Sequence, residues 1–321
     1  MKQVEKLLGY RSSIKVIDAT LRDGGLVNDF FFDDEFVKAL YKTNIDAGVD
    51  YMEMGYRASK KVFDESKFGK WKFSSDEHIR EIVGENNSNL KLAIMADIGR
   101  HDKDDFDQKV NSPVDLVRVA TYIHQLPEAL DMIEDAHNKG YETSCNLMAL
   151  SHVQENDLHA GLEMIGQSPV DTIYIVDSFG SIYPEEMARV VNIFAEFAEK
   201  YNKKLGIHAH NNQQLAFANT IEACGDGVDW LDATYLSMGR GAGNCAMELL
   251  IGFLKNPKYK ELPVFKFIEE YMIGLKQKGI VWGYDVQYLM TGLLNQHPRT
   301  AIAFTKDKRT DYVEFFKDLM L

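Results

Sequence analysis

Hydrophobic positions along this chain follow two periods, and each period is confined to its own segments. Short runs of apolar and β-branched residues recur through the first three quarters of the sequence. They read IKVIDA (14–19), VDYMEM (49–54), KLAIMAD (91–97), DLVRVA (115–120), TSCNLMA (143–149), DTIYIVD (171–177), LGIHAH (205–210) and DWLDATYL (229–236). Runs this short, with apolar side chains on both faces, are typical of the buried strands of a parallel sheet.

The segments between these runs have the helical period. In 33–48, 127–140 and 184–204, apolar residues return near every third and fourth position, and Gly48 and Gly140 are helix stop signals. Strand and helix therefore alternate, which indicates an α/β fold. Because eight strands are apolar on both faces, we expect a closed (β/α)8 TIM barrel rather than an open sheet.

Two more apolar segments, 261–279 and 280–300, follow the last expected strand. They predict extra C-terminal helices that cap the barrel or contact a sister subunit. We therefore divide the chain into a catalytic barrel domain, residues 1–255, and a helical extension, residues 256–321. The segment 56–79 is longer than an ordinary loop, so we expect either a lid over the barrel or a surface excursion there.

Composition narrows the range of partners. The formal net charge is −13 and no Lys/Arg-rich block occurs, so we expect neither nucleic acid nor an anionic membrane as a partner. No segment approaches the roughly 18 to 20 apolar residues of a membrane span, and the first residues lack the apolar core of a signal peptide. These features predict a cytoplasmic protein.

Polar residues gather where the expected strands end, and in a barrel of this kind the carboxyl ends of the strands form the catalytic face. We expect these side chains to point toward one bowl. They are Asp18, Arg22, Asp23, Glu53, Asp97, Asn146 and Asp177.

The seventh strand carries two histidines, His208 and His210, in the sequence IHAH. Side chains two residues apart leave a strand on the same face, about 6 to 7 Å apart. Such imidazoles can share a metal ion, although two polar histidines without a metal would give the same pattern. Barrel closure would bring Asp23 toward them and add an anionic ligand.

A glycine-rich turn, GRGAGN (239–244), follows the eighth strand. Three interpretations are open: a phosphate cradle at a helix N-terminus, a tight turn with Asn244 as the helix cap, or an oxygen ligand supplied by Asn244. Two nitrogen and two oxygen ligands would suit Mn²⁺, Mg²⁺, Co²⁺ or Zn²⁺, with positions left open for a substrate.

Four motifs stand in a distinctive order: TLRDGG (20–25), MEMG (52–55), IHAHNN (207–212) and GRGAGN (239–244). Together they resemble the DRE-TIM metallolyase superfamily, which includes 3-hydroxy-3-methylglutaryl-CoA (HMG-CoA) lyase, isopropylmalate and homocitrate synthases, and 4-hydroxy-2-oxovalerate aldolase. The resemblance covers the whole expected barrel. It implies that Asp23, His208 and His210 are metal ligands and that Asn244 is a further ligand or a close neighbour.

The resemblance also implies a chemistry. A divalent cation polarises the carbonyl of a 2-oxo acid, so the adjacent carbon can carry negative charge as an enolate. Arg22 is permanently cationic and forked, and it would stabilise the enolate oxygen while Asp23 holds the metal. Glu53, the third member of the arginine-aspartate-glutamate signature, is expected to orient Arg22.

Two features of the superfamily are missing. The 4-hydroxy-2-oxovalerate aldolases carry a histidine shortly after RDG, where this chain reads GGLVND, and HMG-CoA lyases carry a catalytic cysteine in the turn where this chain has Arg240. The residue that moves the proton is therefore open. The candidates are Tyr122, His152, Tyr235 and His297. We favour His297, because Pro298 would hold it at a helix end and the added helices could bring it over the site.

These observations predict a divalent-metal-dependent aldolase or lyase that makes or breaks a carbon-carbon bond next to a 2-oxo acid. One alternative is a Claisen-type synthase or lyase that uses an acyl-CoA. An alternative of another class is a barrel that has lost turnover and only binds a metabolite. The apolar C-terminal helices favour a homodimer, because they contain large side chains that need burial: Tyr271, Met272, Trp282 and Tyr288.

Overall fold

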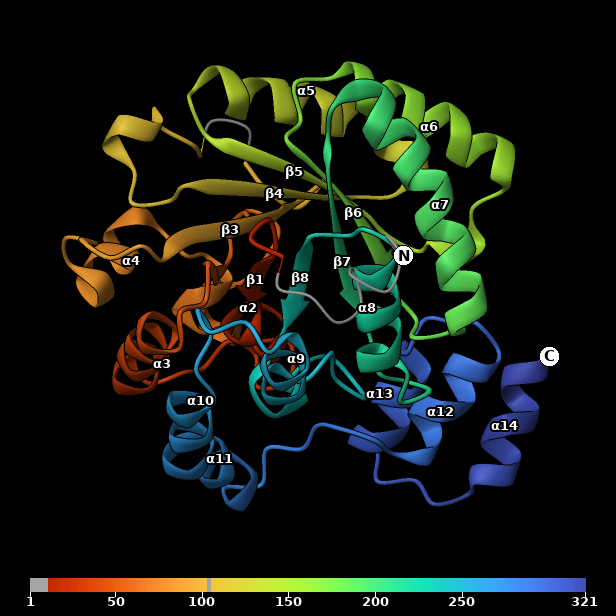
Figure 1. The fold of residues 1–321 in the computed structure, drawn as a ribbon. Coiled ribbons are helices and arrows are strands. Elements are labelled where there is room, and N and C mark those ends of the chain that lie inside the picture. The colour runs from red at the N-terminus through yellow and green to blue at the C-terminus, as the bar shows by residue number, and fades with distance from the viewer. Residues whose placement is uncertain (1–10, 103–104) are drawn as a thin grey trace.

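The computed structural model describes residues 11–102 and 105–321, in which eight parallel strands form one closed barrel (Figure 1). The strands are β1 (Lys15–Asp18), β2 (Tyr51–Tyr56), β3 (Lys91–Asp97), β4 (Leu116–Thr121), β5 (Glu142–Leu147), β6 (Thr172–Asp177), β7 (Lys204–Ala209) and β8 (Trp230–Ala233). Strand β1 pairs with β2 on one side and with β8 on the other, in register from Lys15 opposite Trp230 to Asp18 opposite Ala233. The expected (β/α)8 TIM barrel is therefore confirmed.

Helices surround the barrel and follow the strands in order (Figure 1). They are α2 (Thr20–Gly24), α3 (Asp34–Ala47), α4 (Asp76–Val83), α5 (Leu126–Asn138), α6 (Glu155–Gln167), α7 (Pro184–Tyr201), α8 (Ala216–Gly225) and α9 (Met247–Leu254). Helix α3 ends as expected at Gly48, whose φ of +77° favours glycine. A Cβ at Gly48 would lie 2.3 Å from the carbonyl oxygen of Lys258, so the close approach of the chain also requires glycine.

The long segment after β2 forms part of the wall around the barrel mouth. It contains two short 3-10 helices, η1 (Glu65–Lys67) and η2 (Lys70–Lys72), before α4 begins. Trp71 is fully buried, and the ammonium group of Lys72 lies within 4.2 Å of the centre of the Phe63 ring. The segment is therefore held in place by packed aromatic side chains.

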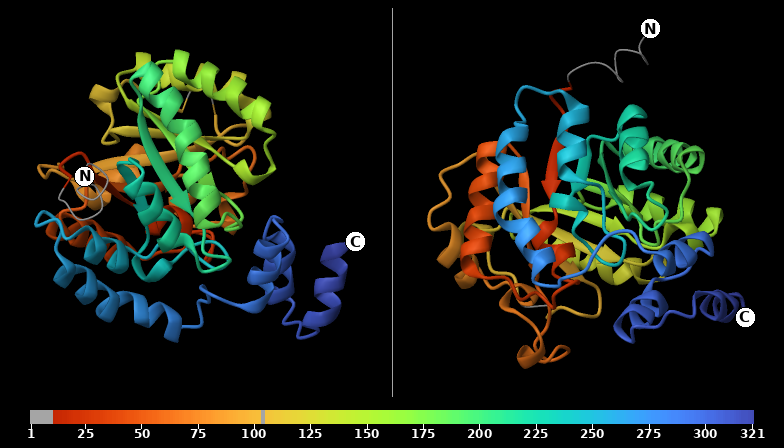
Figure 2. Two further views of the ribbon diagram at one scale, coloured as in Figure 1. Left: turned by 45° about the vertical axis from the view of Figure 1, so that its right-hand side comes forward. Right: turned by 90° about the horizontal axis from the view of Figure 1, so that it is seen from below.

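The expected C-terminal helices form two groups on opposite sides of the barrel mouth (Figures 1 and 2). The first group consists of α10 (Glu261–Phe267), the π-helical turn η7 (Ile268–Met272) and α11 (Ile273–Gln277), and it packs against α3. The second group consists of α12 (Val286–Leu293), α13 (Arg299–Lys306) and α14 (Tyr312–Met320). A Cβ at Gly292 in α12 would lie 2.9 Å from the Cβ of Asn212, so α12 is pressed onto the loop after β7.

The large C-terminal side chains that favoured a homodimer are satisfied within the chain. Met272, Trp282 and Tyr288 are buried, and the ring of Tyr271 stacks on Phe267 at 5.1 Å. Burial of these residues therefore requires no second subunit. Residues 1–10, the start of the expected barrel domain, lie outside the described residues. Within the described ranges, no helix is long and apolar enough to cross a bilayer.

Candidate active site

A cavity lies at the carboxyl ends of the strands, and we call it the inner cavity. Its wall combines apolar side chains with a group of polar ones. The polar residues that line it are Arg22, Asp23, Tyr56, Asp97, Tyr122, Asn146, Ser178, His208, His210, Arg240 and His297. Segments from all parts of the barrel and one residue of the C-terminal extension therefore meet at this point, as expected for the catalytic face of such a fold.

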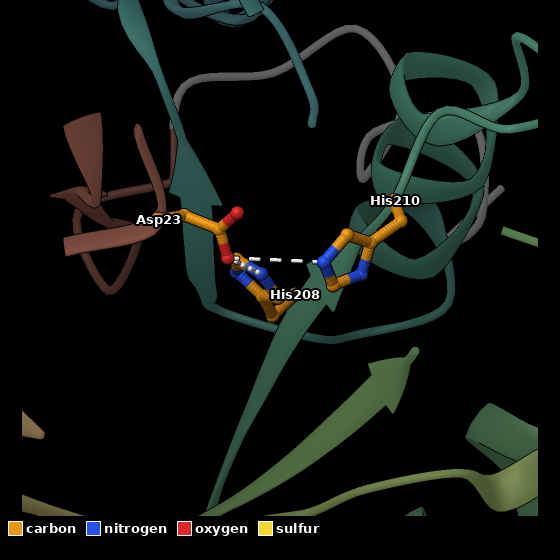
Figure 3. A group of neighbouring side chains, drawn as sticks. All are labelled: Asp23, His208 and His210. Carbon is orange, nitrogen blue, oxygen red and sulfur yellow. Dashed lines mark hydrogen bonds and ion pairs between the residues drawn. The ribbon is translucent and has the colours of Figure 1, made fainter. Parts of the chain in front are cut away.

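Asp23, His208 and His210 line the inner cavity and lie close together (Figure 3). The Oδ2 atom of Asp23 lies 3.2 Å from Nε2 of His208 and 3.7 Å from Nε2 of His210. One possible ligand atom from each of the three residues lies within 4.8 Å of those of the other two. The strand-end rule and barrel closure thus bring together the three residues proposed as ligands, although Asp23 and His208 are 185 residues apart in the chain.

The other ring nitrogen of each histidine is held by a fixed acceptor. Nδ1 of His208 lies 2.9 Å from Oδ2 of Asp232, and Nδ1 of His210 lies 2.9 Å from the carbonyl oxygen of Asp177. An Nδ1–H that donates to these oxygens leaves the lone pair on Nε2, and this assignment of the tautomer follows from the partners. Both lone pairs then face the same point beside Asp23, the arrangement that metal-binding histidines adopt.

Asn244 adds an observation that fits a cation. Its amide nitrogen lies 3.0 Å from Nε2 of His208, while its Oδ1 is buried and has no hydrogen-bond partner. A Cβ at Gly239 would lie only 1.6 Å from that oxygen, so glycine is required for Asn244 to occupy this place. An orphaned amide oxygen, a carboxylate and two imidazole lone pairs are together a donor set that fits a divalent metal ion.

The helix-cap interpretation of Asn244 is wrong. Helix α9 begins at Met247, and its cap position is Ala246. Instead, Asn244 forms an isolated bridge with His210. The turn before it directs the backbone N–H of Arg240 to Oδ1 of Asp23 at 2.8 Å, so this N–H positions a carboxylate.

Six ionisable side chains form a closed ring of contacts, which we call the charge ring; three of them line the inner cavity and three lie below it. Arg22 donates from Nε to Glu53 at 2.7 Å and from Nη1 to Asp23 at 2.5 Å. Arg118 lies 3.1 Å from Glu53 and donates to Asp232 at 2.7 Å. The contacts of His208 with Asp232 and Asp23 close the ring. The guanidinium of Arg22 is thereby fixed on two sides beside the triad.

Burial and neighbouring charges set the charge states of Asp23 and His210. Burial raises the pKa of Asp23, but Arg22 and the two histidines outweigh it and hold that pKa well below its usual range. Burial and the nearby Arg240 lower the pKa of His210 well below its usual range. Asp23 is therefore an anion and His210 a neutral imidazole at neutral pH, which are the forms that bind a metal.

Three of the strand-end residues do not reach the bowl. Asp18 accepts hydrogen bonds from Thr20 and from Asn44 in α3, outside the barrel. Asp177 accepts from the backbone N–H groups of Ser181 and Ile182 and so shapes the loop after β6. Glu53 is fully buried below the cavity and touches Arg22. The expectation that every strand-end residue faces one bowl is thus wrong for these positions. Asp18 and Asp177 point to the opposite face of their strands, whereas Glu53 points into the barrel but contacts Arg22 and Arg118 below the cavity.

The candidate proton carriers separate into two pairs. Tyr235 is fully buried and donates to Asn44, and His152 contacts the carbonyl oxygen of Asn295; neither lines the inner cavity. Tyr122 and His297 do line it. Burial, and then Arg240, Arg299 and Arg100, lower the pKa of His297 to about 4.

The hydrogen bond at His297 indicates which of its nitrogens carries the proton. Nδ1 accepts from the backbone N–H of Arg299 at 3.1 Å. In a neutral imidazole, Nε2 then bears the hydrogen and acts as a donor. His297 is thus placed in the cavity, and its neutral form is suited to donate a hydrogen bond to a substrate oxygen.

Sequence reasoning missed Arg118 and Asp232, which complete the charge ring. A signal was present, because Arg118 is a lone cation inside the apolar run LVRVAT and Asp232 a lone anion inside WLDA. A charged residue in the middle of a buried strand must be paired, so each of these positions indicates a polar network inside the barrel.

Comparison with known proteins agrees with this geometry. The HMGL-like family model matches residues 13–266. The chain belongs to the HMGL-like family. It is 30% identical to an oxaloacetate decarboxylase of Mycobacterium tuberculosis over 244 residues, covering 75% of this chain and 69% of that one. It is 26% identical to a 4-hydroxy-2-oxovalerate aldolase of Bacillus cereus over 319 residues, covering 95% of this chain and 90% of that one.

Solved structures extend the likeness of the fold. The carboxyl transferase domain of Rhizobium etli pyruvate carboxylase, solved with pyruvate, superimposes with a TM-score of 0.69 at 14% identity and covers 94% of this chain and 55% of that one. Membership of the HMGL-like family, with aldolase and decarboxylase relatives, makes this protein a metal-dependent carbon-carbon lyase. The alternative of a barrel without turnover is therefore set aside.

Proposed function

We propose that this protein makes or breaks the bond between C3 of a pyruvate unit and a carbonyl carbon, with Asp23, His208, His210 and Asn244 as the metal ligands. The observation that carries the proposal is the meeting of two imidazole lone pairs and the Asp23 carboxylate beside the fixed guanidinium of Arg22. The metal would be Mn²⁺, Mg²⁺, Co²⁺ or Zn²⁺. When bound there, it would supply Lewis-acid polarisation of the 2-oxo acid carbonyl.

Arg22 is the catalytic residue proposed to stabilise the enolate oxygen. Its Nη2 lies 3.5 Å from Nε2 of His208, so this end of the guanidinium faces the ligand cluster while Nε and Nη1 are held by Glu53 and Asp23. A donor fixed in this way costs no reorganisation when negative charge develops on the oxygen. Glu53 is proposed as a positioning residue that acts through Arg22.

Asp97 and His297 are proposed to handle the two protons. Asp97 is the one carboxylate besides Asp23 that lines the inner cavity in the described structure, and burial raises its pKa. In the direction of bond formation, Asp97 takes a proton from C3 and later releases it to water, C3 bonds to the carbonyl carbon, and that carbonyl oxygen receives a proton from water beside His297. His297 would hold the same oxygen through Nε2–H. In cleavage the bond between C3 and C4 breaks and the electron pair stays on the pyruvate fragment.

The first experiment measures exchange of the pyruvate methyl protons with deuterium by NMR, with Mn²⁺ or Mg²⁺ present and with EDTA as the control. We expect metal-dependent exchange that disappears in Arg22→Ala and His208→Ala. Arg309→Ala, which removes a surface ion pair with Asp311, is the matched control and should exchange at the normal rate. Absence of exchange in the metal-loaded protein would reject pyruvate as the donor.

The same assay separates the roles of Asp97 and His297. Exchange requires only removal of the C3 proton, whereas aldol addition also requires a group at the second carbonyl oxygen. Asp97→Asn should lose both reactions, and His297→Ala should lose addition while exchange persists. Loss of exchange in His297→Ala would assign the C3 proton to His297 instead.

An acyl-CoA substrate is the second candidate, because the HMG-CoA lyase of Brucella melitensis shares the fold, with a TM-score of 0.56 at 15% identity. Two incubations distinguish this reaction from an aldol reaction. A lyase would release acetyl-CoA from HMG-CoA, and a synthase would release free CoA thiol from acetyl-CoA and a 2-oxo acid.

We also propose a homodimer and retain the division into a barrel domain and a helical extension after residue 255. Exposed apolar side chains on α10 and α11, among them Leu262 and Phe265, support a contact between subunits. The molar mass in solution, measured by light scattering, tests the dimer. Leu262→Glu with Phe265→Glu should convert a dimer that uses this face into monomer.

A further inference from the structure

A second cavity adjoins the inner cavity, and we call it the vestibule. The two cavities share part of their walls, including Tyr56, Asp97, Arg240 and His297. The vestibule reaches further, to Lys72, Arg100 and Arg299. A molecule whose reacting carbon lies in the inner cavity would therefore extend its other end into the vestibule.

Positive charge dominates the vestibule, although the chain as a whole carries −13. Four cations line it: Lys72, Arg100, Arg240 and Arg299. Asp97 is the one carboxylate among its described lining residues, and its contact with Arg100 is long, at 3.5 Å. The charges of the wall are thus far from balanced.

Arg100, Arg240 and Arg299 line the vestibule together with His297. After burial, Arg240, Arg299 and Arg100 are the causes that lower the pKa of His297 to about 4. Because electrostatic influence falls with distance, all three arginines must lie near the same imidazole. They come from the loop after β3, the turn after β8 and the start of α13, so the fold assembles them rather than the local sequence.

Lys72 is held in the wall by aromatic rings rather than by an anion. Its Nζ lies 4.2 Å from the centre of the Phe63 ring, 4.6 Å from Tyr56 and 5.1 Å from Phe30. Among the described residues no carboxylate lies within ion-pair distance of it, and only 6% of the residue is exposed. Asp97 favours the charged form of Lys72 without forming an ion pair with it, and burial outweighs this effect, so that the pKa of Lys72 is lowered. A buried ammonium of this kind is unfavourable for folding, so the position is better explained by a ligand than by stability.

We propose that the vestibule binds a phosphate or carboxylate group at the far end of the second substrate, which makes this protein selective for anionic aldehydes or anionic aldol products. The proposal rests on the proposed function, because it concerns the partner of the same reaction. Guanidinium groups pair with both phosphate and carboxylate through two parallel hydrogen bonds. The anionic group is unchanged in the reaction: a C3 proton leaves pyruvate, C3 bonds to the aldehyde carbon, and the aldehyde oxygen gains a proton.

The test compares aldol addition of pyruvate to matched aldehydes with Mg²⁺ present. Glyceraldehyde 3-phosphate is compared with glyceraldehyde, and succinic semialdehyde with butanal. We expect kcat/KM for one charged aldehyde to exceed that of its neutral partner by about tenfold or more, and the pair that shows it identifies phosphate or carboxylate. Equal values in both pairs would overturn the proposal while leaving the lyase function intact.

Substitutions in the vestibule test which residues produce the preference for charged aldehydes. Arg100→Gln combined with Arg299→Gln should bring the ratio between charged and neutral aldehydes close to one, and Lys72→Met should lower it. Lys70→Gln is the matched control, because Lys70 stands on the same η2 turn but pairs with Asp34 at 2.7 Å. A ratio that survives in the double variant would contradict the assignment to the vestibule.

A binding measurement separates failure of the vestibule from failure of the proposed function. Glycerol 3-phosphate, succinate and glycerol are titrated by calorimetry into the protein with Mg²⁺ and pyruvate present. Binding of either anion, absent for glycerol and lost in the double variant, supports the vestibule even when no aldehyde reacts, in which case the proposed reaction is wrong. No binding of either anion, together with equal use of charged and neutral aldehydes, rejects the vestibule alone.

Discussion

The charge ring and the vestibule lie next to each other in the same barrel mouth, but the charges of the ring are paired with one another and those of the vestibule mostly are not. In the charge ring, three carboxylates face two guanidinium groups and a histidine. In the vestibule, four cations face the single carboxylate of Asp97 among the described lining residues. The inner carboxylates and imidazoles suit a metal cation, and the outer excess of positive charge suits an anionic group.

The two regions also differ in how their charges are fixed. Every member of the charge ring contacts two others, and these contacts restrict the orientation of each side chain. In the vestibule, Arg100 is about half exposed and its contact with Asp97 is long. Preorganised charge is what catalysis requires, whereas exposed charge can adjust to the end of a substrate. Variants in the two regions should therefore behave differently.

The largest effect is expected from breaking the charge ring. Arg118→Met leaves Glu53 and Asp232 buried without their shared partner, which should lower the free energy of unfolding by about 3 to 5 kcal/mol. Chemical denaturation measures this loss. Arg309→Met, which removes an exposed pair with Asp311, should leave the stability nearly unchanged. A similarly small loss in Arg118→Met would show that the ring is not a structural unit.

The next effect concerns Arg22. Arg22→Lys keeps the charge but loses the fork that contacts Glu53 and Asp23, so pyruvate exchange should slow by about 10²- to 10³-fold. The metal content of the purified variant should stay near that of the unmodified protein, because none of the four proposed ligands is changed. A decrease below about tenfold would mean that charge alone, without orientation, is sufficient.

A smaller effect is expected where the ring supports a metal ligand indirectly. Asp232→Asn weakens the hydrogen bond to Nδ1 of His208, and metal affinity should fall by about 10- to 100-fold. Titration with Mn²⁺, followed by electron paramagnetic resonance, measures the affinity. Asp229→Asn, just before the same strand but paired with Arg11, is the control and should bind Mn²⁺ normally. Unchanged affinity in Asp232→Asn would remove the residue from the metal site.

The smallest effect is expected at Lys72, where substitution should stabilise the protein slightly rather than destabilise it. Burial lowers the pKa of Lys72 from 10.5 to about 8. Folding therefore disfavours its charged form, and this penalty is fully present below pH 8 and disappears as the pH rises from 8 toward 10.5. Lys72→Met should keep or slightly raise the melting temperature at pH 7, and its advantage should vanish at high pH.

Thermal melts of both proteins from pH 7 to pH 10 test this expectation. A clear fall in the melting temperature of Lys72→Met at pH 7 would make Lys72 a structural residue, held for its contacts with the aromatic rings. A stable variant with weaker selectivity for charged aldehydes would instead support a lysine kept for binding.

The chain itself was sufficient to predict the barrel and the meeting of Asp23, His208 and His210. Strands that are apolar on both faces require burial on both sides, and the carboxyl-end rule then places Asp23, His208 and His210 at one mouth. The same rule was wrong for Asp18 and Asp177, because it gives the end of a strand but not the face to which a side chain points. Their hydrogen bonds to Asn44 and to the loop after β6 became visible only in the folded structure.

The local sequence thus determined the elements, their order and the type of chemistry, since these depend on periodicity and on residue type over a few positions. The tertiary structure decided the partners of those residues. Arg118 meets Asp232 across the barrel at a separation of 114 residues, and Lys72, Arg100, Arg240 and Arg299 meet from four distant segments. Such contacts depend on strand register, on barrel closure and on the packing of the C-terminal helices, which are set by the burial of the whole chain and not by any local pattern.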